Sequence, residues 1–176
     1  AATVSSASAT LLFVNGTWNH TQNGGTLPTA TYALTSNVNV TGIVGTAPTP
    51  PATIGGNFTW NSAGQTGTAL SLVSTLTTIG GTCTIQSTGS GSMQFGTSPT
   101  LAVAGLATVS GGTVLAAGGT LNFNGGLTLS GGSISALVGA STTSINVNGN
   151  YTQNGGTLTS AAASSSADMN STVPRI

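Results

Sequence analysis

The stretch that decides the fold reads Thr-Val-Leu-Ala-Ala-Gly-Gly at 113–119, Thr-Leu-Asn-Phe-Asn-Gly-Gly at 120–126 and Leu-Thr-Leu-Ser-Gly-Gly at 127–132. In each segment a short run with alternating apolar residues ends in a pair of glycines. Alternation with a period of two is typical of a strand with one buried face. Glycine allows the tight corner that must follow, because it carries no Cβ. Three short strands in succession, each closed by a corner, are what one turn of a three-sided β-solenoid requires.

The same pattern extends to both sides of this stretch. Helices are not expected, because Ser and Thr supply 55 of the 176 residues and few strong helix formers remain apart from Ala and Leu. Glycine pairs lie further apart in the rest of the chain and fit turns with longer corners. We expect strands at 121–124, 127–129, 134–138 and 145–148, and corners at the glycine pairs 24–25, 55–56, 80–81, 111–112, 118–119, 125–126, 131–132 and 155–156.

A longer phrase is repeated along the chain. Val-Asn-Gly-Thr-Trp-Asn-His-Thr-Gln-Asn-Gly-Gly-Thr-Leu at 14–27 returns as Val-Asn-Gly-Asn-Tyr-Thr-Gln-Asn-Gly-Gly-Thr-Leu at 147–158, two residues shorter. A looser copy lies at 56–61, and 122–126 echoes it again. Repeats that cannot bury their own apolar face become stable by stacking. We therefore expect Phe58, Phe123 and Tyr151 to occupy similar environments in one core.

These phrases resemble the β-strand repeats of secreted bacterial adhesins and autotransporter passengers. The resemblance is carried by residues 105–160, 14–27 and 54–61. It implies a right-handed parallel β-helix in a secreted protein. The predicted fold class is therefore all-β, a right-handed parallel β-solenoid-like stack of strands with Gly-Gly corners. The alternative is a β-sandwich or jelly-roll-like subunit completed by a donor strand.

Charge is almost absent from the chain and excludes several classes of function. Arg175 is the only basic residue and Asp168 the only acidic one, so 1% of the residues are charged, where about 25% is usual. Nucleic-acid binding needs several Lys or Arg to neutralise phosphates, and an anionic membrane surface attracts clusters of the same cations. The sequence predicts neither partner.

The chain is expected to form one β-rich structural domain over residues 1–176, since a domain usually takes about 100 to 200 residues. No apolar run approaches the roughly 18 residues of a spanning helix, so no transmembrane segment is predicted. We interpret the sequence as a mature chain without its signal peptide and expect a secreted protein, extracellular or on the cell surface. Cys83 has no internal cysteine partner and is expected to be a buried thiol, with an intermolecular disulfide as the alternative.

Groups that could perform catalysis are too few to predict an enzyme. The chain has one His, one Asp, one Cys and no Glu or Lys, so paired carboxylates for glycoside hydrolysis cannot be built. A Ser-His-Asp set from His20 and Asp168 is formally possible but has no supporting motif. One His and one Cys do not make a zinc site, and no cofactor is predicted.

Two surface chemistries are also compatible with the sequence. Thr-x-Thr pairs at 29/31, 75/77, 82/84 and 157/159 are similar to the threonine ladders of ice-binding solenoids, but their spacing is irregular. That function is the most remote of the alternatives. Secretion would also expose Asn-x-Ser/Thr sequons to glycosylation. The candidate glycosylation sites are Asn15, Asn19, Asn39, Asn57, Asn150 and Asn170.

The favoured function is that of a structural subunit of an extracellular homopolymeric filament or surface layer. Soluble proteins protect unpaired strand edges with Lys, Pro or bulges, but this chain has no Lys and no Pro between 100 and 173. Residues 1–14, with Leu11, Leu12, Phe13 and Val14, form a candidate donor strand for a neighbouring copy; pairing within its own subunit is equally open. Residues 160–176 are a candidate interface tail. The main alternative is a monomeric adhesin or ligand-binding module, with surface glycans as candidate partners.

Overall fold

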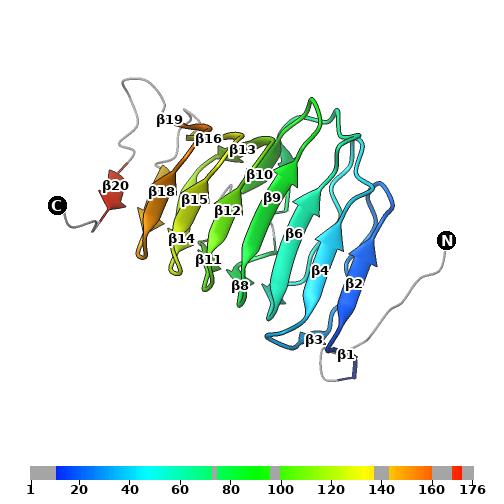
Figure 1. Cartoon of the computed structure of the whole chain (residues 1–176). Helices are drawn as coiled ribbons and strands as arrows, with labels where there is room; N and C mark the ends of the chain where they lie inside the picture. Colours follow the sequence, from blue (N-terminus) through cyan, green and yellow to red (C-terminus); the bar gives the residue numbers. More distant parts are fainter. Residues whose placement is uncertain (1–10, 73–74, 96–99, 137–142, 160–167, 172–176) are drawn as a thin grey trace.

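The computed structural model describes residues 11–72, 75–95, 100–136, 143–159 and 168–171, and these form parallel strands without a helix. The chain winds into a β-solenoid of about six turns, and successive turns stack along one axis (Figure 1). The fold class and the parallel solenoid predicted from the sequence are confirmed. The alternative of a sandwich completed by a donor strand is wrong for this chain.

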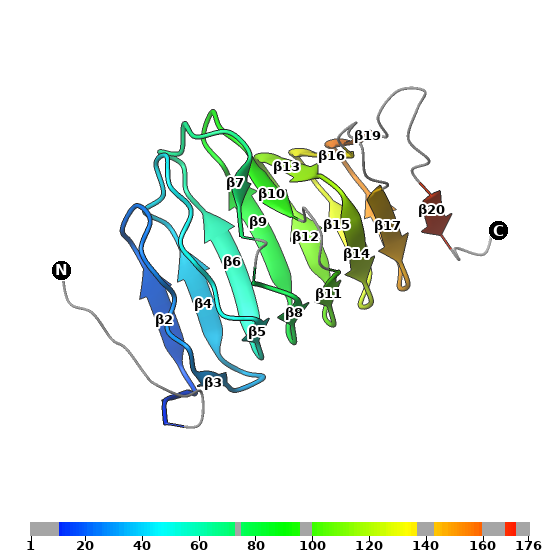
Figure 2. The same cartoon turned by 180° about the vertical axis from the view of Figure 1, so that it is seen from behind.

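Three parallel sheets form the three sides of the coil, which Figure 2 shows from behind. The seven-stranded sheet contains β2 (Thr17–His20), β4 (Asn37–Val40), β6 (Asn57–Asn61), β9 (Cys83–Ser87), β12 (Ala107–Val109), β15 (Leu127–Leu129) and β18 (Tyr151–Gln153). The six-stranded sheet contains β5 (Thr53–Ile54), β8 (Thr78–Ile79), β11 (Leu101–Val103), β14 (Gly119–Phe123), β17 (Thr143–Val147) and β20 (Asp168–Ser171). The five-stranded sheet contains β7 (Leu70–Ser71), β10 (Met93–Phe95), β13 (Thr113–Ala116), β16 (Ser133–Ala136) and β19 (Thr157–Thr159).

A separate pair of strands accompanies the first turns of the coil. It consists of β1 (Phe13–Val14) and β3 (Thr31–Tyr32), which pair in parallel. Each of the two strands leads into a strand of the seven-stranded sheet, as β5, β8, β11, β14 and β17 do in later turns. None of the described segments forms a helix long and apolar enough to cross a membrane.

The expected turn over 113–132 is confirmed, since Thr113 lies opposite Ser133, the first residue after that stretch. Some turns have the same length, as from Thr17 to Asn37, and others are longer. In the seven-stranded sheet Phe58 lies opposite Cys83, and Cys83 lies opposite Ala107. The extra residues are accommodated at the corners. The predicted glycine pairs lie at or beside strand ends or, for 24–25, beside the bridge residue Thr26. Strand register stays regular while the turn length varies, except for one shift between Trp60 and Asn61, where β6 pairs with β9.

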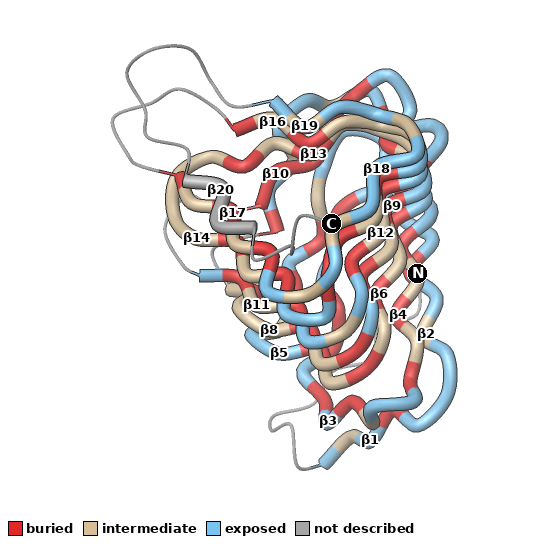
Figure 3. Tube along the Cα trace, turned by 60° about the vertical axis from the view of Figure 1, so that its left-hand side comes forward, coloured by how far each residue is buried: buried red, intermediate tan, exposed pale blue. Residues whose placement is uncertain are grey.

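The core is a continuous column of buried apolar side chains inside the coil. Figure 3 shows that buried positions recur from turn to turn. Trp60 and Phe58 are the largest fully buried side chains of the core. Alternation accounts for this arrangement, because every second residue of a strand points to the same face. In β6, for example, Phe58 and Trp60 are buried while Asn57 and Thr59 are half-buried on the outside.

The repeated phrase marks one place on three different turns. Trp18, Phe58 and Tyr151 belong to the same inward-facing row of the seven-stranded sheet. Strand pairing connects them in steps of one strand, and the residues between them in the row are Val38, Cys83, Ala107 and Leu127. The expectation of similar environments is confirmed only in part. Phe58 and Tyr151 share this row, but Phe58 is fully buried and Tyr151 is half-buried in the last turn. Phe123 is buried in the same core but lies in the six-stranded sheet, opposite Val103 and Val147. A glycine pair precedes Phe58 but follows Phe123, so the two lie on opposite sides of a corner.

Candidate interface at the ends of the solenoid

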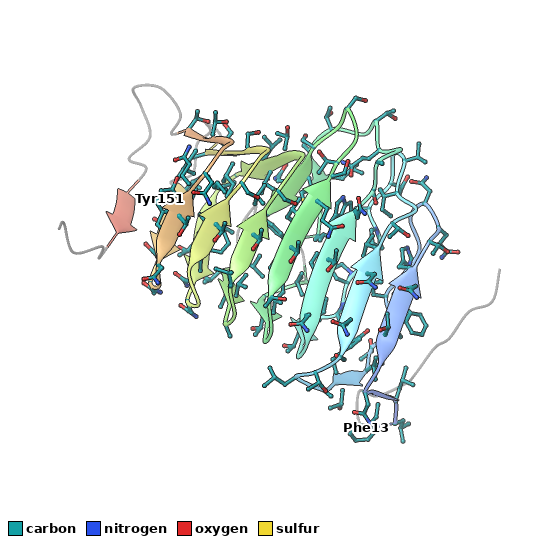
Figure 4. The ribbon with its side chains drawn as sticks, in the orientation of Figure 1. Phe13 and Tyr151 are labelled. Carbon is teal, nitrogen blue, oxygen red and sulfur yellow. The ribbon has the colours of Figure 1, made fainter. Side chains whose placement is uncertain are left out.

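Unpaired strand edges occur at both ends of the coil. Within the described part of the chain, β2 has a neighbour on one side only, and so do β18 and β19 at the opposite end. Figure 4 labels one residue near each end, Phe13 and Tyr151. The six-stranded sheet differs, because β20 adds one more strand beyond β17. These edges offer backbone N–H and C=O groups to a further strand.

Residues 11–14 alternate between the core and the solvent. Val14 is buried and Leu12 packs against the core, whereas Phe13 is 65% exposed and Leu11 75% exposed. Phe13 and Val14 form β1, which pairs with β3 of the same chain. The strand predicted as a donor is thus bound within its own subunit where it is described, and its role between subunits stays a prediction. Residues 1–10 lie outside the described part.

Two amphipathic side chains of β2, Trp18 and His20, lie at the first end of the core. Trp18 is half-buried, and its indole Nε1 is enclosed without a hydrogen-bond partner among the described residues. A buried N–H group without a partner typically costs about 1–3 kcal/mol. His20 is buried, and its Nε2 lies 2.8 Å from the carbonyl oxygen of Gly24. His20 is therefore a buried residue of an edge strand, and no exposed loop holds it.

Amphipathic side chains also end the core at β18. Tyr151 is half-buried, and its hydroxyl donates to Gln153 Oε1 at 2.7 Å. Partial burial raises the pKa of Tyr151. Leu158 in β19 is partly buried against the core. The two ends of the coil thus present an aromatic residue in the same inward row, Trp18 at one end and Tyr151 at the other.

Asparagine side chains link successive turns along the outer faces. Asn39 Nδ2 donates to Asn19 Oδ1 at 3.0 Å, and Asn57 Nδ2 donates to Asn37 Oδ1 at 3.1 Å. Two further pairs, Asn146 to Asn122 and Asn148 to Asn124, do the same at 2.8 Å. Such amide ladders are characteristic of stacked parallel strands. They stabilise contacts between turns by hydrogen bonding without charge.

The six sequons are not equivalent as attachment sites. Asn15 and Asn150 are exposed in the connections before β2 and β18. The amide nitrogens of Asn39 and Asn57 donate in the ladders described above. Asn19 is exposed and accepts a ladder bond, while the side chain of Asn170 in β20 lies outside the described part. Among the sequons, Asn15 and Asn150 therefore have the geometry most open to modification.

Threonines form one regular row that the sequence did not reveal. Consecutive strands of the seven-stranded sheet pair at these residues, so the side chains share one outward position on five turns. The Thr-x-Thr spacing in the sequence does not produce this row, because the turns differ in length. The row consists of Thr59, Thr84, Thr108, Thr128 and Thr152.

The residues capable of acid–base or metal chemistry are dispersed. His20 lies in β2, Cys83 in β9 and Asp168 in β20. Cys83 is buried in the described structure, and burial raises the pKa of its thiol to about 12. No three His, Cys, Asp or Glu residues of the described segments gather into a group that could hold a metal ion.

Comparison with protein-family models, curated proteins and solved structures finds no match for this chain.

Proposed function

We propose that this chain is a structural subunit of an extracellular homopolymer, a filament or surface layer, whose copies join end to end through strand pairing. The observation that carries the proposal is the open edge of the seven-stranded sheet at both ends of the described coil, with β2 at one end and β18 at the other. A contact between two different surfaces of the same molecule propagates into an open chain unless its rotation closes a ring. Parallel strands that already stack within one copy can continue the same stack into the next.

The charge distribution supports association at these ends. Asp168 and Arg175 are the only charged side chains in the sequence, and no Lys is available to protect a strand edge. A net charge near zero also removes the long-range repulsion that keeps many proteins monomeric. The extracellular location is proposed from the composition and from the exposed sequons Asn15 and Asn150.

Dilution and staining test this function. The purified chain is expected to form fibres or sheets in negative stain and particles in light scattering whose mass grows with concentration. Addition of EDTA or about 1 M salt should leave the assemblies intact, because screening surface charge removes none of the backbone hydrogen bonds between strands. Particles of constant monomer mass at every concentration would instead favour the monomeric adhesin or ligand-binding module. Assemblies that dissolve in EDTA would contradict cohesion by strand pairing alone.

A second candidate function follows from the threonine row between Thr59 and Thr152. A regular array of hydroxyl and methyl groups on a rigid sheet can order water against an ice surface, and this row repeats once per turn over five turns. Thermal hysteresis of the dispersed chain, lost in Thr108→Tyr, would favour ice binding. Its absence would leave the row as ordinary packing of β-branched residues on a sheet.

A further inference from the structure

Glycines line the corner that leads into the seven-stranded sheet, and the preceding turn explains each of them. A Cβ on Gly81 would lie 2.7 Å from the carbonyl carbon of Gly56, and a Cβ on Gly105 would lie 2.7 Å from that of Gly81. Backbone atoms at this distance cannot move aside as a flexible side chain can. Gly125 and Gly149 also meet the backbone of a neighbouring turn. Glycine therefore holds this corner in most turns, and the exception is the second turn, where Ser36 precedes Asn37 of β4.

Gly16 occupies the same corner in the first turn, but no described residue of its own chain explains it. Gly16 precedes Thr17 and Trp18 of β2 as Gly81 precedes Thr82 and Cys83 of β9. A Cβ on Gly16 would meet no atom of the described residues within 4 Å. Its φ is not in the left-handed region, so the backbone conformation does not require glycine either.

At the same corner, a side chain of one turn forms hydrogen bonds with the next turn. Asn57 Oδ1 accepts hydrogen bonds from the backbone N–H of Thr82 at 2.9 Å and from its hydroxyl at 3.0 Å. This is possible because Gly81 has no side chain: a Cβ there would lie 2.4 Å from Asn57 Oδ1. Asparagine in one turn, followed by Gly-Thr in the next, therefore forms a compact link between turns.

The two ends of the molecule hold the separated halves of this link. Asn150 precedes Tyr151 in the last strand of the sheet as Asn57 precedes Phe58, and its repeat is the one that matches residues 14–27. Gly16 and Thr17 stand at the other end in the places of Gly81 and Thr82. Asn150 is exposed, and so are Gly16 and Thr17. A second copy stacked on β18 would bring Gly16 and Thr17 to Asn150.

The inward rows match in the same alignment. Tyr151 would meet Trp18 of the next copy, and aromatic pairs gain from such contact. The indole Nε1 of Trp18, which has no partner among the described residues of its own chain, would then lie beside a polar tyrosine hydroxyl.

From these observations we infer that copies join head to tail in a fixed register, with Asn150 of one copy bound to Gly16 and Thr17 of the next. This inference rests on the proposed function and specifies its partner, a second copy of this chain. Asn150 Oδ1 accepts from the N–H and hydroxyl of the next copy's Thr17. Gly16 supplies the space for that contact.

The junction also requires a change in β20. Val14 and Val147 hold the same place in the repeated phrase, so Val14 of the incoming copy would lie against Val147. Ser171 of β20 holds that position within the chain. Strand β20 therefore has to leave β17 when the next copy docks, which makes β20 a cover that competes with assembly.

Replacing Gly16 with alanine tests the junction with little effect on the subunit. Gly16→Ala should unfold at the same denaturant concentration as the wild type, because its Cβ meets no described atom of its own chain. Its critical concentration for assembly should rise at least tenfold, because the Cβ would strike the backbone near Gly149 of the neighbouring copy. Gly64→Ala is the matched control, since a Cβ there also meets no described atom and the residue lies in a corner away from the ends. Gly64→Ala should assemble as the wild type does.

Cysteine cross-linking tests the register, and the first pair of variants leaves the Asn150 contact intact. In the inferred register Thr152 of one copy lies opposite Asn19 of the next, so Asn19→Cys mixed with Thr152→Cys should give a disulfide-linked dimer under mild oxidation. Thr17→Cys mixed with Thr152→Cys should not, because the two positions are offset by two residues and exceed disulfide reach. Suppose that the wild type forms filaments. If the mixture of Asn19→Cys and Thr152→Cys then gives no cross-link, or if Gly16→Ala assembles normally, the inferred junction is overturned and the proposed function still stands. A wild-type chain that never assembles would overturn both.

Discussion

Above about pH 9 the chain is expected to lose stability steeply, because its buried Cys83 thiol resists ionisation. Burial raises the pKa of Cys83 from 9.0 to about 12. Between those values the unfolded chain releases the proton and the folded chain keeps it, so rising pH favours unfolding. The difference between these two pKa values corresponds to about 4 kcal/mol at most. This stability is complete below pH 9 and is lost as the pH approaches 12.

Denaturant titrations at pH 7, 9 and 11 measure this loss, with Cys83→Ala as the control. Alanine fits this position because Ala107 holds the next place in the same row. The variant should lose less stability above pH 9 than the wild type does. It should still lose some, because burial also raises the pKa of Tyr32 to about 12. Equal losses in both proteins would show that the thiol is not responsible. Below pH 9 little change is expected, since the chain has one His and one acidic side chain.

Trp60→Ala is expected to destabilise the subunit by about 4 kcal/mol, within the usual range for removing a fully buried tryptophan. Trp60 is fully buried in β6, and its Nε1 donates to Gln65 Oε1 at 3.0 Å. Gln65 is itself buried, and its Nε2 donates to the carbonyl oxygens of Gly67 and Ser92. The substitution therefore opens a cavity and also leaves the Gln65 oxygen without its donor.

Trp18→Ala provides the matched control for Trp60→Ala. Trp18 lies in the edge strand β2, is half-buried and has no hydrogen-bond partner for its Nε1 among the described residues. Its removal should cost less than half as much in the free energy of unfolding, measured by denaturant titration of the dispersed chain. Equal losses from the two substitutions would contradict the view that the core is sealed in the middle of the coil and open at its ends.

Local sequence pattern predicted four strands between 121 and 148 and the corners at the glycine pairs, for reasons that the contacts explain. At Gly81 the preceding turn leaves no room for a Cβ, so the glycine pairs in the sequence mark corners, although the corner before β4 carries Ser36 instead. Alternation predicts which residues face the core, because the pleat of a strand allows only two directions. Both signals are local, and both need no knowledge of which strand pairs with which.

Relations between turns were harder to predict, because the turns differ in length. Thr108 lies between Thr84 and Thr128 in the sheet, but it is further along the chain from Thr84 than from Thr128. No constant period therefore reveals the threonine row. The short repeat at 122–126 did not predict the sheet of Phe123, for a related reason. A short repeat specifies a sheet only when its position relative to the corner is also known.

The structure also changes how the N-terminal strand can be tested. Lysines at Leu12 and Val14 would not test the candidate donor strand alone, because Val14 is buried and Leu12 packs against the core of its own chain. Those lysines would destabilise the subunit itself. The sequence could not distinguish these positions from Leu11 and Phe13, whose side chains are mostly exposed.

The axial rise per subunit in a filament, measured by electron cryomicroscopy, tests the account most directly. If copies stack as the turns do, each adds the seven strands of the seven-stranded sheet at about 4.8 Å per strand. The predicted rise is therefore about 34 Å, with the strand spacing unbroken across the junction. A filament with a different rise and a gap between subunits, or a chain that stays monomeric at every concentration, would contradict end-to-end strand pairing.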